Sequence, residues 1–123
     1  MKSLSDAELL IMEVLWGGQT FLLGEVVEAL KIKKHWSRNT VHTYLTRMEK
    51  KNLVKIDRTH EPHRYCYVLS RNEYLQWERN RLLNKVYQGS VTDLMSAFLK
   101  DSKITPEEKA KLNQILDEME VSV

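Results

Sequence analysis

The sequence contains little cysteine, proline or glycine and no long apolar run. Cys66 is the only cysteine among 123 residues, so no disulfide can form within the chain and nothing indicates an oxidising compartment. The longest unbroken apolar run covers residues 9–12, far short of the roughly 20 residues that a membrane-spanning helix needs. No targeting segment is recognisable at the start of the sequence, so we expect a cytoplasmic protein.

Proline and glycine number only two and four, and the chain is 42% hydrophobic and 29% charged. This composition is typical of a compact, helix-rich protein and argues against a disordered one. The net charge of +2 is unevenly distributed: residues 31–64 contain ten Lys or Arg against three Asp or Glu, whereas residues 70–123 contain eight against nine. The basic stretch indicates a half that binds a polyanion, and the near-neutral stretch indicates a half with another role.

Residues 36–51 predict a helix that has no acid on its outer face. It begins at a favourable N-cap, Ser37, and its single acid, Glu49, lies off that face. The apolar stripe at helical spacing consists of Val41, Tyr44, Leu45 and Met48. The opposite face carries residue types that bind base edges and phosphates, namely Arg38, Asn39, His42, Thr43, Thr46, Arg47 and Lys50. Taken alone, this segment is compatible with a DNA-recognition helix or with an ordinary polar surface helix.

The elements around this helix predict a winged helix-turn-helix. A first helix begins at a capping box formed by Ser5 and Glu8 and ends at Gly17. Residues 21–23 suggest a very short strand, and residues 24–31 a second helix. After residue 51 the hydrophobic period changes from 3.6 to 2, which predicts a β-hairpin with strands at 54–58 and 64–69. Three helices followed by a hairpin is the winged-helix order, in which a later helix enters the major groove.

The remaining residues, 71–123, predict three helices that lack a core of their own. One runs from residue 71 to about residue 87, the next is capped by Ser90, and the last begins at Thr105 and Pro106. Each carries an apolar stripe, and a unit of about fifty residues is only marginally stable alone. A two-fold dimer would bury these stripes, and packing against the N-terminal domain is the alternative. The predicted dimerisation residues are Leu82, Leu83, Val86, Leu94, Phe98, Leu112, Ile115 and Leu116.

We therefore predict a mainly α protein with a small β-hairpin. Residues 1–70 form a winged-helix DNA-binding domain, and residues 71–123 form a three-helix dimerisation region. The partners are double-stranded DNA and a second copy of the chain, and no cofactor is expected. The predicted DNA-binding residues are Arg38, Asn39, Thr40, His42, Thr43, Thr46, Arg47, Lys50, Lys51, Arg58 and Arg64, joined at the hairpin by His60 and His63. Arg47 and Asn39 are the best candidates for base readout, because Arg pairs with guanine and Asn with adenine through two hydrogen bonds.

Nearly the whole chain resembles a known family. The first helix shares Leu-Ser-Asp-Ala-Glu at residues 4–8 and Val-Leu-Trp at 14–16, and the third shares the run Trp-Ser-x-x-Thr-Val-x-Thr-x-x-x-Arg over residues 36–47. The Tyr-Cys-Tyr strand at 65–67, Glu-Tyr at 73–74, Gly-Ser at 89–90 and the final Leu-rich helix complete the similarity. On these motifs the chain resembles the penicillinase-repressor family of winged-helix regulators, of the BlaI, MecI and CopY type.

The resemblance implies a homodimeric transcriptional repressor on a palindromic operator, often of β-lactam resistance or copper-handling genes. Family recognition contacts would fall on Asn39, Thr40, His42, Thr43, Thr46 and Arg47, although the family often has Pro-Lys where this chain has Arg38 and Asn39. Copper-responsive members carry Cys-x-Cys pairs near the C-terminus, and this chain has no cysteine after Cys66. The β-lactam-responsive members are cleaved after a membrane sensor-protease is triggered, and the matching bond here is Ala97–Phe98. Well-known members have Asn where Ala97 stands, and Phe98 also fits the apolar stripe.

The residues also bear on three other classes of function. An enzyme is not indicated, because the chain has no Gly-rich phosphate loop, nucleophile elbow or His-Glu-x-x-His motif. A metal-responsive regulator would use His60, His63 and Cys66, but side chains three residues apart in a strand point to opposite faces, so no metal site is expected. A winged helix that binds proteins would show acids or exposed apolar residues on the outer face of the third helix, and neither is present there.

Overall fold

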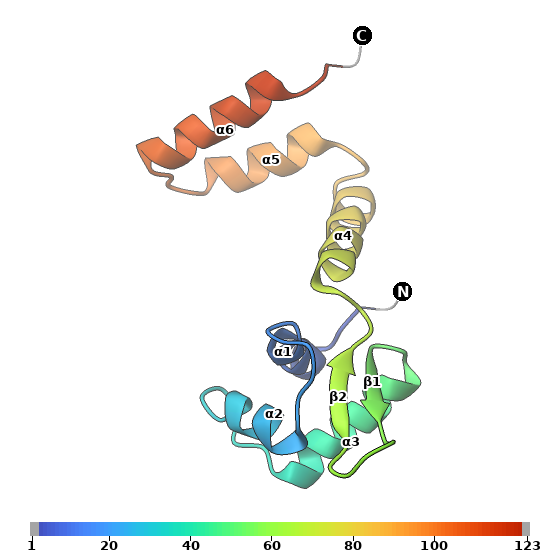
Figure 1. The fold of residues 1–123 in the computed structure, drawn as a ribbon. Coiled ribbons are helices and arrows are strands. Elements are labelled where there is room, and N and C mark those ends of the chain that lie inside the picture. The colour runs from blue at the N-terminus through green and yellow to red at the C-terminus, as the bar shows by residue number, and fades with distance from the viewer. Residues whose placement is uncertain (1–2, 122–123) are drawn as a thin grey trace. The chain divides into compact units, whose positions relative to one another are not determined.

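The computed structural model describes residues 3–121, which are mainly helical with one antiparallel hairpin of two strands, as the sequence predicts (Figure 1). The helices and strands are α1 (Asp6–Leu15), α2 (Leu23–Leu30), α3 (Arg38–Lys50), β1 (Val54–Asp57), β2 (Arg64–Tyr67), α4 (Arg71–Arg81), a π-helical segment (Leu82–Val86), α5 (Val91–Lys100) and α6 (Pro106–Glu118). The chain divides into two compact units, one ending at Asn80 and the other beginning at Arg81.

Local capping explains where most of these helices begin. Ser5 and Glu8 form the predicted reciprocal box: the Ser5 amide donates to Glu8 Oε1 at 2.9 Å and the Glu8 amide to Ser5 Oγ at 3.2 Å. The same exchange opens α4 and α6, where Ser70 bonds with Glu73 and Thr105 with Glu108.

The start of α2 differs from the prediction of a short strand followed by a helix at residue 24. Phe21 pairs with Tyr65 in a single isolated bridge, and α2 begins at Leu23. The Leu22 amide donates to Glu25 Oε1 at 2.7 Å. A carboxylate three residues into a helix stabilises its first turn, so the helix begins sooner than the apolar pattern suggested.

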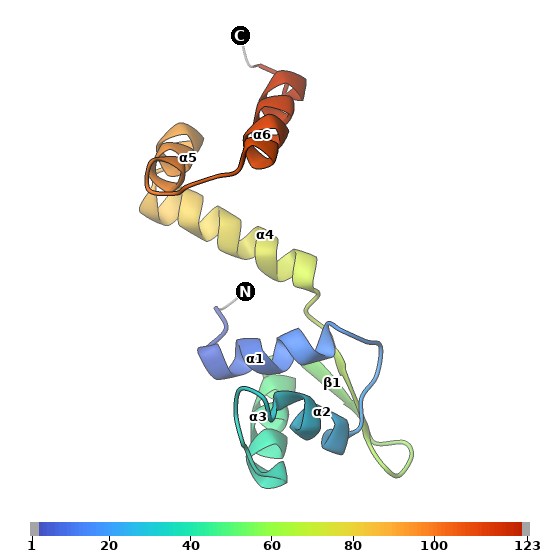
Figure 2. The ribbon, with the colours of Figure 1, turned by 90° about the vertical axis from the view of Figure 1, so that its left-hand side faces the viewer.

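One hydrophobic core holds the first unit together. α1 packs on α2 and β2, α2 on α3, and α3 on β1. Figure 1 shows α3 starting below α2 and passing behind the hairpin, and Figure 2 shows α1 above α2 and α3. The buried hydrophobic residues are Ile11, Met12, Leu15, Val26, Leu30, Val41, Leu45, Met48, Leu53, Val54, Ile56, Tyr65 and Leu69. The Trp16 indole donates to the Leu69 carbonyl at 2.9 Å, and its ring lies 5.8 Å from that of Tyr74. The start of α4 therefore packs on the first unit.

The hairpin is shorter than the alternating pattern suggested. Its register pairs Val54 with Tyr67 and Asp57 with Arg64. The amides of Val68 and Leu69 both donate to the carbonyl of Leu53, at 2.9 and 3.1 Å. The chain bends at these two residues, so β2 ends at Tyr67 and not at the predicted residue 69.

The second unit has helices with apolar stripes and no buried residue in α5 or α6.

The predicted single helix from residue 71 to about 87 is an α-helix that changes to π geometry at Leu82, with the Tyr87 amide donating to the Leu82 carbonyl at 3.2 Å. It ends at Val86, close to the predicted residue 87, and the chain then turns at Gly89, where φ is +82°. Across residues 3–121 no helix is long and apolar enough to cross a membrane.

Candidate nucleic-acid interface

The core orients α3. Ser37 caps the helix by accepting from the Thr40 amide at 3.1 Å, and Val41, Leu45 and Met48 are fully buried. The predicted apolar stripe is thereby confirmed, with Tyr44 half-buried against the core. The predicted contact residues of α3 lie on the other side: Arg38, Asn39, His42, Thr43, Arg47 and Lys50 are exposed, and Thr40 and Thr46 are half-buried.

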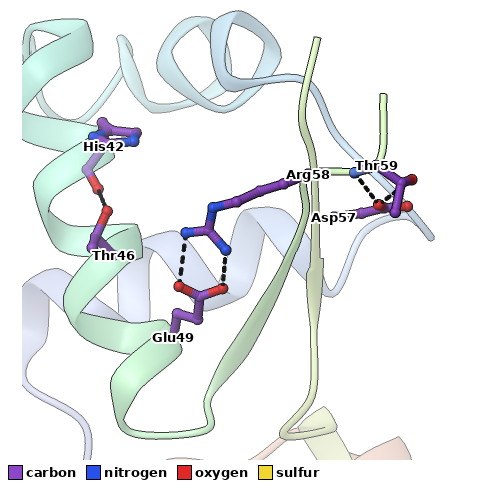
Figure 3. Close-up of polar contacts among 6 residues, drawn as sticks. All are labelled: His42, Thr46, Glu49, Asp57, Arg58 and Thr59. Carbon is purple, nitrogen blue, oxygen red and sulfur yellow. Dashed lines mark hydrogen bonds and ion pairs between the residues drawn. The ribbon is translucent and has the colours of Figure 1, made fainter. Parts of the chain in front are cut away.

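Two threonines on this face have their hydroxyl hydrogens engaged. Thr43 Oγ1 donates to the carbonyl of Asn39 at 2.8 Å, and Thr46 Oγ1 donates to the carbonyl of His42 at 2.8 Å (Figure 3). A hydroxyl that donates to its own helix cannot also donate to a phosphate oxygen, which accepts only. In this arrangement the threonines offer a methyl group and an oxygen lone pair to a ligand.

The two predicted base readers line one surface hollow. Asn39, Thr40, Thr43, Tyr44 and Arg47 surround a hollow of about 290 Å³ on α3. Tyr44, which forms part of its wall, packs against Trp36 with the rings tilted by 32° and their centroids 5.0 Å apart. The hollow therefore has a supported wall and polar groups suited to a base edge.

A larger open pocket, about 580 Å³, lies between the start of α2, α3 and the hairpin loop. Its polar lining includes Arg38, His42 and His63, together with the acids Glu25 and Glu61. Gly24, which the sequence reasoning missed, also lines it, and a Cβ there would come within 3.1 Å of Arg38 Nη1. The place of Gly24 next to the start of α2 is the only sequence signal for this close approach.

Lys51, one of the predicted DNA contacts, is paired with a buried acid. Its Nζ lies 2.8 Å from Oε2 of Glu8, whose side chain is 7% exposed. Burial by itself would raise the pKa of the Glu8 carboxyl, but hydrogen bonds from Lys51 and Ser5 outweigh it, so the pKa lies below its ordinary value. The pair joins α1 to the end of α3.

Arg58, another predicted DNA contact, is held by Glu49. Its Nη1 and Nη2 donate to the two carboxylate oxygens of Glu49 at 2.7 and 2.9 Å (Figure 3). These hydrogen bonds lower the pKa of Glu49 and raise that of Arg58. The side chains of Glu49 and Arg58 are 29% and 50% exposed, so the pair is partly open to solvent.

The three residues that a metal-responsive regulator would use lie beside other side chains. His60 Nδ1 lies 3.0 Å from Thr59 Oγ1, and His63 Nε2 lies 3.1 Å from Glu61 Oε1. Cys66 lies on β2 opposite Lys55. In the part of the chain that the structure covers, no three His, Cys, Asp or Glu side chains gather as a metal site would require.

Comparison with known proteins identifies the family. The family model described as penicillinase repressor matches residues 4–118. A penicillinase repressor of Bacillus licheniformis is 30% identical over 115 residues, which cover 94% of this chain and 90% of that protein. The methicillin resistance regulatory protein MecI of Staphylococcus aureus (strain N315) is 24% identical over 114 residues, 93% of each chain. A solved structure, NadR in complex with 4-hydroxyphenylacetate, is 19% identical and covers 94% of this chain and 73% of its own, with a TM-score of 0.47.

The family match spans nearly the whole chain, including the helix with the acid-free face and the C-terminal helices. The chain therefore belongs to the penicillinase repressor family, and it is a DNA-binding transcriptional repressor rather than an enzyme.

Proposed function

We propose that the protein is a homodimer that represses transcription in the cytoplasm by binding a palindromic operator, with α3 of each protomer in a major groove. The observation that carries this proposal is the outer face of α3, which is mostly exposed, has no acid in its first turn and is oriented by a fully buried apolar stripe, while the one acid of the helix, Glu49, is paired with Arg58. A two-fold dimer would place two such helices on half-sites about one helical turn apart.

The proposed contacts divide by role. Asn39 and Arg47 read bases from the hollow on α3, and Thr43 and Thr46 present methyl groups that suit thymine. The backbone is held by the exposed cations of the interface and by the hairpin loop, namely Arg38, Lys50, Arg64, His60 and His63, with Thr40 and His42 beside the base readers. The contact set omits Lys51 and Arg58, because each already binds a carboxylate.

The second unit supplies the proposed dimer interface. No residue of α5 or α6 is buried, and Phe98, Ile115 and Leu116 are 51%, 49% and 65% exposed. Large apolar side chains in such a small unit favour burial against a second copy. The proposed interface consists of Leu82, Leu83, Val86, Leu94, Phe98, Leu112, Ile115 and Leu116.

Loss of the dimer would release the operator, because each unit would then bind one half-site without the gain from linkage. We propose cleavage at Ala97–Phe98 by a membrane sensor-protease system as the trigger. Both residues lie inside α5, so the helix must open locally before a protease can reach the bond. The relatives are named for penicillinase repression and methicillin resistance, which favours an antibiotic-resistance or related stress operon as the target.

Selection of bound duplexes from a random DNA pool, at about 150 mM salt, tests the function. We expect a palindromic consensus with two half-sites, because two identical units must contact one duplex. Recovery of unrelated sequences that bind only at low salt would instead indicate a non-specific binder. No retention of DNA at all would contradict the proposed function.

Arg47→Ala tests the orientation of α3. We expect operator binding to weaken by about 1–3 kcal/mol per contact and one base position in each half-site to lose its preference, because a bidentate contact is removed. Lys50→Ala is the matched control, since it removes the same charge from α3. It should weaken binding to operator and scrambled DNA equally. Unchanged binding by Arg47→Ala to both duplexes would show that α3 is turned differently.

A further inference from the structure

We propose that Glu49 and Arg58 form a clamp that holds the hairpin at a set angle to α3, and that Arg58 is a positioning residue rather than a phosphate contact. The inference rests on the proposed DNA-binding function, because this angle matters when α3 and the hairpin engage the same duplex. Neither residue has this role in the contact pattern that the sequence predicts.

The Glu49–Arg58 ion pair connects α3 to the end of β1, in addition to the chain segment that joins the two elements. Residues 51–53 join the end of α3 to the start of β1, and Asn52 turns the chain there with φ at +60°. Glu49 lies in the last turn of α3, and Arg58 directly follows β1. Their two parallel hydrogen bonds, 2.7 and 2.9 Å, fix the plane of the guanidinium as well as its distance.

The backbone around Arg58 is also held. The Asp57 carboxylate accepts from the Thr59 amide at 2.9 Å and from Thr59 Oγ1 at 2.6 Å (Figure 3). An aspartate that bonds the backbone two residues ahead stabilises a turn. The hairpin loop therefore leaves β1 in a fixed direction, with Arg58 tied to α3 at its base.

Electrostatics favours the clamp over a phosphate contact. The positive charge of Arg58 is already offset by Glu49, and a phosphate that took the same two N–H groups would leave an unpaired carboxylate in the last turn of α3, beside Lys50. That carboxylate would repel the duplex. Replacing Glu49 by a DNA phosphate as the partner of Arg58 would therefore add little binding free energy. The pairing also explains how a helix that faces a polyanion contains an acid.

The test is a double-mutant cycle on the operator recovered from the DNA selection, using the full chain at several salt concentrations. Glu49→Gln keeps the shape of the side chain and removes its charge, and Arg58→Ala removes the partner. We expect each variant to weaken binding by about three- to tenfold, and the double variant to be no weaker than Arg58→Ala. The slope of log K against log salt should stay that of the wild type for Arg58→Ala.

A phosphate contact predicts the opposite results. Glu49→Gln would then bind more tightly, because a negative charge near DNA is removed. Arg58→Ala would lose a slope of about 0.9 per phosphate, or about 1.8 for a dimer, and the two changes would add. Arg58→Lys would bind nearly as well as the wild type, because lysine serves a phosphate as a point charge. Any of these results would overturn the clamp.

Two controls separate the clamp from general charge effects and from folding. Glu28→Gln removes an exposed glutamate that pairs with Lys31 at 2.9 Å on α2, and its binding should equal or slightly exceed that of the wild type. Arg64→Ala removes an arginine of the hairpin opposite Asp57, and it should reduce the salt slope. If Glu28→Gln lost as much operator affinity as Glu49→Gln, the clamp would be overturned. Failure of the wild-type chain to bind any duplex would overturn the DNA-binding function itself.

Discussion

Lys50 and Lys51 are neighbours in the chain and differ in what they contact. Lys50 is an exposed residue of α3, whereas Lys51 binds Glu8 across a separation of 43 residues. Glu8 is the one buried charged residue among residues 3–121. A carboxylate buried without a partner is costly, so we assign Lys51 a structural role.

Lys51→Ala should destabilise the first unit by about 1 kcal/mol at neutral pH, lowering its melting temperature by roughly 4–8 °C. The pKa of Glu8 is lowered in the folded chain, so the pair stabilises the fold above the ordinary value of 4.5, and this contribution is lost as the pH falls through the folded value. Thermal melting at neutral and acidic pH is the measurement. The difference in melting temperature between Lys51→Ala and the wild type should be smaller at acidic pH.

Lys50→Ala is the control for that measurement. It should leave the melting temperature unchanged and reduce the salt slope of operator binding. An unchanged melting temperature for Lys51→Ala together with a shallower salt slope would return Lys51 to the set of DNA contacts.

At the scale of elements, α5 and α6 differ from α1 and α3 in how far their apolar faces are buried. The inner faces of α1 and α3 are fully buried within the first unit, whereas α5 and α6 keep their apolar stripes accessible. A helix of 10 or 13 residues is marginal in water without tertiary packing. These two helices therefore depend on a partner for burial, which in our proposal is a second copy.

Leu116→Lys should dissociate the proposed dimer without unfolding the first unit, because the Leu116 side chain is 65% exposed in the single chain. Operator affinity should fall by about 10²–10⁴-fold as linkage of the two half-sites is lost. Analytical ultracentrifugation gives the mass, and circular dichroism reports the helix content. Asn113→Lys adds the same charge at an exposed polar position of α6 and should remain dimeric. A Leu116→Lys variant that stays dimeric would place the interface elsewhere.

At the scale of the whole molecule, the asymmetry of charge matches the division into two units. The basic stretch at residues 31–64 lies in the first unit, with α3 and the hairpin, and the second unit is near neutral. A dimer would therefore bring two basic surfaces to one polyanion.

If a dimer neutralises about eight phosphates, log K for the operator should fall with log salt at a slope near −7. Fluorescence anisotropy over a salt series measures this slope. The Leu116→Lys monomer should show about half of it, because one unit contacts half as many phosphates. Equal slopes for dimer and monomer would mean that a single unit makes all of the backbone contacts.

Local patterns were sufficient for much of the fold. The buried and exposed faces of α3, the capping boxes at Ser5, Ser70 and Thr105 and the order of helices and hairpin follow from spacings of a few residues, and the structure agrees with them. α2 begins at Leu23, one residue before the predicted start, and the strand predicted at residues 21–23 is a single bridge at Phe21, because this apolar run is typical of a strand as well as of a buried helix start.

The sequence by itself determined which face of α3 can meet a ligand, because helical periodicity separates apolar from polar residues within the segment. Only the tertiary structure decided which of the predicted DNA-binding cations form ion pairs with acids of the protein itself. Lys51 and Arg58 resemble the other cations in sequence, but folding brings Glu8 and Glu49 within hydrogen-bond distance of them. The physical reason is that the strength of an ion pair depends on distance in space. Glu8 and Lys51 are 43 positions apart in the chain, and Glu49 and Arg58 are 9 apart, and the packing of α1, α2, α3 and the hairpin brings each pair together.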